Sequence, residues 1–252
     1  MRKSKMSRLS RDSAQYNDRV AEHYAAYRPP LHQKILSLAL PKNRRFQVGL
    51  DIGSGTGYSA IALAEYCDSV FGVEPSDAMR ESARPHEKVR YLSGHGAAIP
   101  LKESSVDIIT FAGSLFYINV PTLIPEIQRV CRHQGYVLAY DFEVLLEPVL
   151  TELTLTANQQ SDGYDHAVNF SSVEILDEIV VRRDQIDLAI SADELSHILL
   201  ASPGRYAALV TTLGRRNLFD NLRKIISGKV GLTSIGINIF YSNYQLKNNE
   251  SV

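Results

Sequence analysis

The period of the apolar residues changes repeatedly along the first half of the chain. Short apolar runs, typical of buried strands, alternate with segments whose apolar residues recur at helical spacing. The runs predict strands at 46–52, 69–74, 89–94, 106–113 and 135–143, and the segments between them predict helices at 58–67, 76–84 and 121–133. Gly135 is expected to close the last of these helices. Because strands and helices alternate with short connections, we expect an α/β fold with a doubly wound, mostly parallel sheet.

The pattern changes after residue 143. Extended or alternating segments at 174–190 and 234–247 predict later strands, and the sheet would then be seven-stranded. Helical stretches are expected at 144–160, 191–202, 204–213 and 217–228, with a polar loop at 161–172. We therefore divide the chain into an N-terminal helix and tail (1–30), a ligand-binding core (31–143), a helical lid insertion with a late strand (144–231) and a final strand that completes the core (232–252).

Three glycines, Gly53, Gly55 and Gly57, stand between the first predicted strand and its helix. A glycine-rich turn at a helix N-terminus presents backbone N–H groups and lets a ligand approach the backbone closely. The dinucleotide fingerprint G-x-G-x-x-G is not met, because Tyr58 occupies the place of its third glycine. The G-K-[ST] of a P-loop and the G-x-S-x-G of a hydrolase elbow are also missing. The loop predicts a ligand site at the carboxyl edge of the sheet.

Two carboxylates narrow the choice of ligand. Asp51 precedes the glycines and would repel a pyrophosphate, whereas it suits a ligand that carries an ammonium group. Glu74 ends the second predicted strand, where an acid is placed to accept hydrogen bonds from ribose hydroxyls. The two acids together indicate a nucleoside with a cationic, amino-acid-like tail, a description that S-adenosylmethionine fits.

Five stretches carry a resemblance to a known family. They are LDIGSGTG (50–57), GVEPSDAM (72–79), GHGAAIP (94–100), VDIITFAGSLFYI (106–118) and LIPEIQRVCRHQGYVLAYDFE (123–143). In order and spacing they resemble the motifs of class I S-adenosylmethionine-dependent methyltransferases, and AEHYAAYRPP (21–30) resembles the entry segment of the small-molecule, methyltransferase type 11-like branch. The resemblance implies a Rossmann-like methyltransferase fold with S-adenosylmethionine as cofactor and methyl donor.

The resemblance also implies a donor site. Asp51, Gly53 and Gly55 would contact the methionyl amine and carboxylate, and Glu74 would bind the ribose hydroxyls. Pro75 and Met79 would pack on the adenine, and the segment 94–96 would read its edge. The full set assigned to the donor is Tyr27, Asp51, Gly53, Ser54, Gly55, Glu74, Pro75, Met79, His95, Gly96, Ala112 and Ser114.

Some of these positions keep two interpretations. The family commonly has Asp and Glu where this chain has His95 and Ala97. His95 therefore either accepts a hydrogen bond from the adenine amino group or points to solvent. Tyr27 resembles a tyrosine that closes over the donor, and the alternative is simple packing.

Methyl transfer needs alignment of donor and acceptor, and a base only where the acceptor arrives protonated. Asp141 and Tyr117 are the predicted catalytic residues, although Asp141 could instead cap a helix and Tyr117 is the wall of a pocket rather than a base. Many relatives carry a histidine pair where this chain has Phe116 and Tyr117, so no histidine base is expected there. The other candidates near the acceptor are Tyr24, Tyr27, Tyr140 and His166, with a surface position favoured for His166.

Composition excludes several classes of partner. The formal net charge of −1 argues against nucleic acid, and no apolar run is long enough to span a membrane. The two cysteines are far apart in sequence and lack metal-ligand spacing, which favours a reducing, cytoplasmic setting and predicts no metal. We expect a small-molecule acceptor and a monomer or homodimer.

The leading hypothesis is a methyltransferase that modifies an O, N or C atom of a small molecule by in-line transfer. A nicotinamide-dependent oxidoreductase is opposed by the glycine spacing and by Asp51. A non-catalytic S-adenosylmethionine-binding protein or partner subunit is the main alternative, since the histidine pair and two acids of the family are replaced. A tRNA or protein methyltransferase is disfavoured by the near-neutral charge.

Overall fold

The computed structural model describes residues 19–20, 22–23, 29–154, 163–229 and 232–247. The chain divides into two compact units, each assembled from three separate segments. One unit, which contains most of the sheet, comprises residues 30–143, 163–185 and 238–252, and we call it the sheet unit. The other comprises residues 1–29, 144–162 and 186–237, and we call it the helical unit. The predicted insertion is thus divided between the two units, because its residues 163–185 belong with the sheet.

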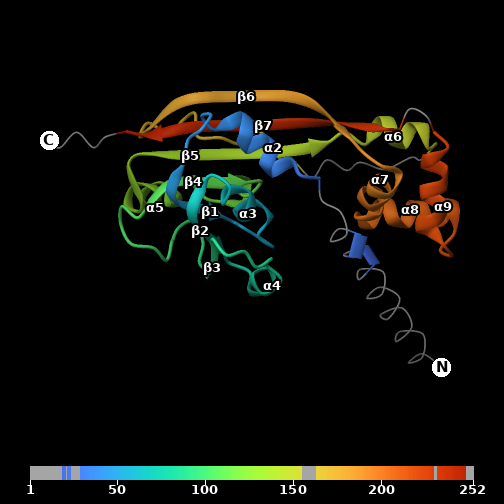
Figure 1. Ribbon diagram of the computed structural model, residues 1–252, viewed down its shortest axis with the longest axis horizontal. Helices are drawn as coiled ribbons and strands as arrows, with labels where there is room; N and C mark the ends of the chain where they lie inside the picture. Colours follow the sequence, from blue (N-terminus) through green and yellow to red (C-terminus); the bar gives the residue numbers. More distant parts are fainter. Residues whose placement is uncertain (1–18, 21, 24–28, 155–162, 230–231, 248–252) are drawn as a thin grey trace. The chain divides into compact units, whose positions relative to one another are not determined.

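Within the described residues the sheet has seven strands, as the sequence pattern predicts. They are β1 (Phe46–Ile52), β2 (Cys67–Glu74), β3 (Val89–Ser93), β4 (Val106–Ala112), β5 (Cys131–Val144), β6 (Leu176–Ala189) and β7 (Ser234–Leu246). Their spatial order is β3-β2-β1-β4-β5-β7-β6 (Figure 1). The first five strands pair in parallel, so their carboxyl ends meet at one edge. This confirms the doubly wound, mostly parallel α/β fold.

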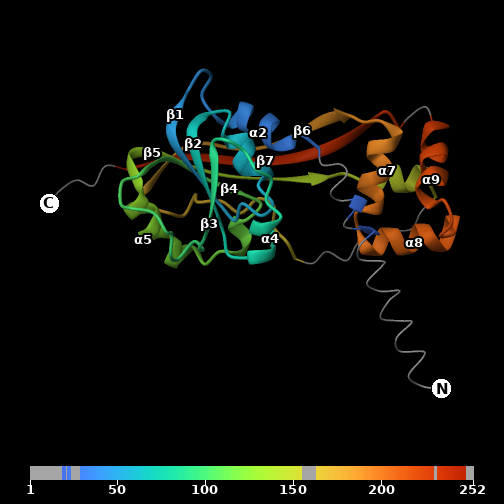
Figure 2. The same ribbon diagram turned by 60° about the horizontal axis from the view of Figure 1, so that its bottom comes forward.

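Helices cover both faces of the parallel part of the sheet (Figure 2). Those of the sheet unit are α2 (Leu31–Ala39), α3 (Tyr58–Leu63), α4 (Asp77–Glu81) and α5 (Val120–Val130), with a 3₁₀ turn at Leu115–Tyr117. Leu50 and Phe111 belong to the apolar core together with Leu123 of α5. A Cβ added at Gly49, the residue before Leu50 in β1, would point to the opposite face of the sheet and lie 2.9 Å from the Leu63 side chain of α3. Since successive strand residues face opposite sides, α3 and α5 cover opposite faces.

Two local expectations for the first half of the chain need correction. Gly135 does not close α5, because the helix ends at Val130 and β5 begins at Cys131, which places Gly135 inside the strand. An added Cβ at Gly135 would lie 2.4 Å from the sulfur of Cys131, so close packing explains this glycine. Asp141 does not cap a helix either, because β5 continues to Val144.

The helical unit contains α6 (Glu147–Glu152), α7 (Ala192–Leu200), α8 (Pro203–Leu213) and α9 (Leu218–Ser227). A capping box begins α7: the Ser191 side chain accepts from the Glu194 backbone N–H, and the Glu194 side chain accepts from the Ser191 backbone N–H. No helix in the described ranges is long and apolar enough to cross a membrane.

Two histidines meet inside the helical unit. The Nδ1 atoms of His23 and His197 lie 3.0 Å apart, and both rings contact Phe219. The pKa of His23 is lowered by burial and then by the charge of His197, against a smaller opposing effect of Glu22. The pKa of His197 is also lowered, chiefly by burial. The pair is therefore held in its neutral form.

We expect the helical unit to lose stability as the pH falls below the ordinary histidine value of 6.5. The unfolded chain takes up these protons at a higher pH than the folded chain, so the stabilisation is fully present above that value and is lost below it. Hydrogen exchange of the α7–α9 amides between pH 5 and 8 measures the effect. His197→Gln should flatten this dependence, while His133→Gln, at an exposed position of the sheet unit, should leave it intact. The prediction would be contradicted if the exchange of these amides depended equally on pH in the wild type and in both variants.

Candidate functional site

The glycine loop after β1 has the backbone that its sequence requires. Gly53, Gly55 and Gly57 have φ angles of 74°, 52° and 91°, a region that residues with a Cβ rarely adopt. The Gly53 N–H donates to the Val73 carbonyl at 2.8 Å, which ties the loop to the end of β2. An added Cβ at Gly57 would lie 2.0 Å from the Tyr91 hydroxyl oxygen. The loop is therefore held tightly against β2 and β3.

Glu74 closes the same loop from the end of β2. Its side chain is buried, and its two carboxylate oxygens accept from the N–H groups of Gly55 and Ser76, each at 2.9 Å. Each oxygen keeps a lone pair for another donor, since a carboxylate has about four acceptor positions. The carboxylate can therefore hold the loop and bind a hydroxyl-bearing ligand at once.

A cavity of about 340 Å³ lies beside the loop in the sheet unit. Its walls come from the ends of neighbouring strands, as expected for the ligand edge of a parallel sheet. The predicted donor residues that line it are Gly53, Glu74, Pro75, His95, Gly96, Ala112 and Ser114, and the predicted catalytic residue Tyr117 lines it too. The structure thus brings together most of the residues assigned from the sequence.

The remaining predicted donor residues do not line this cavity. Asp51 is fully buried and does not line the cavity, because its carboxylate accepts from Ser59 at 2.6 Å and Thr110 at 2.8 Å. Burial raises the pKa of Asp51 to about 6, although the two hydroxyl donors oppose the shift. Ser54 is buried, and Met79 is 48% exposed on α4. Gly55 contributes its N–H to Glu74, as described above.

Two predicted tyrosines, Tyr24 and Tyr27, lie outside the described residues. Tyr140 is buried, and its hydroxyl lies 3.1 Å from Nδ1 of His32. Burial and the nearby carboxylates raise the pKa of Tyr140 well above its ordinary value, so it stays protonated at neutral pH. Tyr117 is 76% exposed, a position that suits a pocket wall.

A hydrogen-bonded cluster stands at the carboxyl end of β5. The Asp141 Oδ2 atom lies 2.8 Å from Nδ1 of His166 and 2.8 Å from the Tyr164 hydroxyl. The Tyr164 hydroxyl also lies 2.8 Å from the Gly113 carbonyl oxygen. Since an ionised carboxylate only accepts hydrogen bonds, Nδ1 of His166 carries a proton, and in the neutral ring Nε2 has a lone pair. Asp141 thus orients the His166 ring, an arrangement that acid–base enzymes use.

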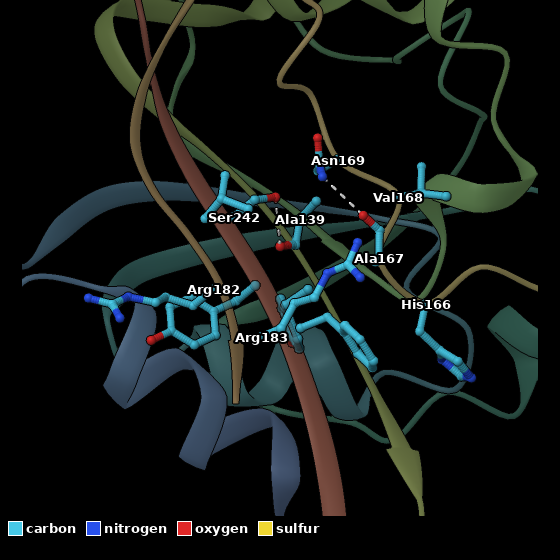
Figure 3. A pocket seen from close by; sticks show the side chains of 12 residues that line it. Ala139, His166, Ala167, Val168, Asn169, Arg182, Arg183 and Ser242 are labelled. Atoms are coloured by element: carbon cyan, nitrogen blue, oxygen red, sulfur yellow. Dashed lines mark hydrogen bonds between the residues drawn. The ribbon is translucent and has the colours of Figure 1, made fainter. Parts of the chain in front are cut away.

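His166 is not the surface residue that the sequence favoured. Its side chain is 30% exposed, contacts the Tyr164 ring and stacks on Phe240. It lines a small pocket with Asn169 and Arg183, shown in Figure 3, and a second small pocket with Gly113 and Asp141. Gly113 also lines the cavity of about 340 Å³ beside the glycine loop, so the cluster around His166 and that cavity share a wall.

Tyr164 was missed by the sequence analysis. The triplet Tyr164-Asp165-His166 within a polar loop was a possible signal, but nothing local connects it with Asp141. Across the described ranges, no group of three or more His, Cys, Asp or Glu side chains could hold a metal ion. The residues that line the cavity can bind a ligand, and the His166 ring can accept or donate a proton.

Comparison with known proteins identifies relatives of this chain. Residues 50–139 match a sequence family described as a methyltransferase domain. A Dictyostelium discoideum protein described as a methyltransferase is 28% identical over 127 residues, which cover 50% of this chain and 48% of that protein. YcgJ of Bacillus subtilis, an uncharacterized methyltransferase, is 31% identical over 120 residues, which cover 45% of this chain and 47% of YcgJ. The chain thus spans about half the length of these curated relatives.

The fold is also shared with a solved structure. A protein of Anaeromyxobacter dehalogenans described as a type II methyltransferase gives a TM-score of 0.59, covering 88% of this chain and 98% of that one. The two sequences are 18% identical, so this likeness concerns the fold.

Proposed function

We propose that this chain, which belongs to the class I S-adenosylmethionine-dependent methyltransferases, transfers a methyl group from S-adenosylmethionine to a small molecule in the cytoplasm. The observation that most strongly supports this function is the cavity of about 340 Å³ at the carboxyl ends of the strands, with the buried Glu74 carboxylate in its wall. The near-neutral charge favours a small acceptor over nucleic acid. The two buried, free cysteines fit a reducing compartment.

The residues present fit the donor. Glu74 would accept from the ribose hydroxyls, and the glycine loop leaves room for the donor's amino-acid tail beside its backbone. Asp51, mostly ionised above pH 6, would attract the ammonium group through space rather than by contact.

His95 would act differently from the sequence expectation. Its Nδ1 atom accepts from the Ala97 N–H at 3.3 Å, so the neutral ring carries its proton on Nε2. His95 would therefore donate to an adenine ring nitrogen instead of accepting from the amino group.

The bound donor supplies an activated methyl group on a sulfonium. The chain's contribution is to align the acceptor with that group and to exclude water. Where the acceptor is a hydroxyl, Nε2 of His166 would take its proton as the oxygen–carbon bond forms. Asp141 would stabilise the imidazolium that results, through the bond at Nδ1. This role favours acceptors that must lose a proton, and it replaces the direct role in catalysis predicted for Asp141.

Calorimetric titration with S-adenosylhomocysteine tests the proposal. We expect wild-type protein to bind, and Glu74→Gln to bind about 5- to 100-fold more weakly. The amide removes the charged acceptor and sets an N–H group against a backbone donor, a loss of about 1–3 kcal/mol. Glu81→Gln makes the same chemical change at an exposed position of α4 and should bind like wild type.

No binding by folded wild-type protein at millimolar ligand would overturn the proposal. Unchanged affinity in Glu74→Gln would remove Glu74 from the donor site. Binding with no S-adenosylhomocysteine formed from S-adenosylmethionine, across a broad panel of small hydroxyl, amine and carbon acceptors, would favour a non-catalytic binding protein.

A further inference from the structure

The outer strand β6 presents an open edge. It runs from Leu176 to Ala189, and its neighbour in the sheet on one side is β7 (Figure 1). No described strand pairs with its other side. Unpaired strand edges offer a row of backbone N–H and C=O groups to a further strand.

Apolar side chains are exposed on this strand. Ile179 is 49% exposed and Val181 is 37% exposed, and both belong to the small set of large apolar side chains that the described part of the chain leaves exposed. Val180, between them, is partly exposed. β-branched residues of this kind gain most from a neighbouring strand that packs against them.

The charges of β6 are arranged symmetrically around Val180. Asp177 and Glu178 precede the apolar residues, and Arg182 and Arg183 follow them. Neither arginine takes part in an ion pair with the described residues, and Asp177 has one long contact of 3.5 Å to Lys247. Figure 3 shows Arg182 and Arg183 pointing to opposite sides of the strand, as strand geometry requires.

We propose that β6 pairs with β6 of a second copy of this chain, antiparallel about a two-fold axis at Val180. This register sets Arg182 opposite Glu178 of the second copy on one face. It sets Arg183 opposite Asp177 and Ile179 opposite Val181 on the other face. Each contact occurs twice by symmetry, so the strand is complementary to itself, as a two-fold interface requires.

Neighbouring registers lack this complementarity. With the axis at Val181, Asp184 stands opposite Glu178, and Arg182 and Arg183 stand opposite apolar residues. With the axis at Ile179, Glu178 stands opposite Val180 and Arg182 opposite Leu176. Since opposite charges that face each other stabilise a strand pair and like charges destabilise it, the charges favour the register at Val180. The same pattern identifies the partner as a second copy rather than an unrelated strand.

Sedimentation velocity over a range of protein concentrations, at low salt, tests the proposal. We expect a concentration-dependent dimer. Arg182→Glu should raise the dimer dissociation constant about tenfold or more, because two attractive pairs become repulsive. Glu178→Arg should do the same. The double variant carrying Glu178→Arg and Arg182→Glu exchanges the charges and should restore dimerisation.

Lys224→Glu makes a charge reversal at an exposed position of α9 and serves as the control that keeps the dimer. Circular dichroism melting of every variant separates lost dimerisation from lost folding. The proposal fails if the wild type is monomeric at all concentrations. It also fails if the single reversals dimerise like the wild type, or if the double variant stays monomeric while folded.

Discussion

Gly53→Ala is expected to raise the dissociation constant for S-adenosylhomocysteine by at least about 100-fold. Gly53 has a φ of 74°, and an added Cβ would lie 2.5 Å from Cβ of Ser114. Both residues line the cavity, so the clash and the backbone change act on the donor site itself. A strained left-handed residue costs about 1–2 kcal/mol, and the clash forces the segment after β4 to move. A 100-fold change corresponds to about 2.7 kcal/mol.

Gly214→Ala is the matched control outside the donor site. Gly214 has a φ of 78°, but an added Cβ there would meet no atom within 4 Å. It caps α8 and does not line the cavity. We therefore expect a loss of stability with donor affinity close to that of wild type. Calorimetry on folded protein measures both variants, and equal affinity in Gly53→Ala and wild type would show that the donor binds elsewhere.

His166→Gln is expected to lower the rate of methyl transfer to a hydroxyl acceptor by about 100- to 10,000-fold, the range for a lost general base. Asp141→Asn should lower it less, because the imidazole remains but loses its orienting carboxylate. Donor affinity should stay within a few-fold of wild type in both variants, since neither residue lines the donor cavity.

The measurement is S-adenosylhomocysteine formation with the best acceptor from a small-molecule panel, at several pH values. Raising the pH should partly rescue His166→Gln, because more of the acceptor is then already deprotonated. His133→Gln, at an exposed position, is the control. Wild-type rates in His166→Gln with a hydroxyl acceptor would remove the histidine from the mechanism.

The strand and helix order and the loop of three glycines could be predicted from sequence, because both depend on short-range patterns. Glu74 was also identifiable, because the end of β2 is marked by the change from apolar to polar residues. The burial of Asp51 could not be predicted in this way. A parallel strand is covered on both faces, so its apolar run does not show which way each side chain points.

The cluster around His166 illustrates a different limit. Asp141 and His166 are separated by 25 residues, and their contact depends on how the segment after β5 folds back onto the sheet. The sequence 161–172 has the composition of a polar loop, which is compatible with a solvated position. Long-range packing alone decides that the histidine is half-buried beside a carboxylate.

The position of β7 has a consequence for synthesis of the chain. β7 lies between β5 and β6 in the sheet, yet it is the last of the three to leave the ribosome. Until residues 234–246 emerge, β5 and β6 lack the strand that joins them in the finished sheet, and the nascent chain exposes aggregation-prone edges. Contacts this distant in sequence form slowly. Folding of the sheet is thus completed only after translation has passed its last strand.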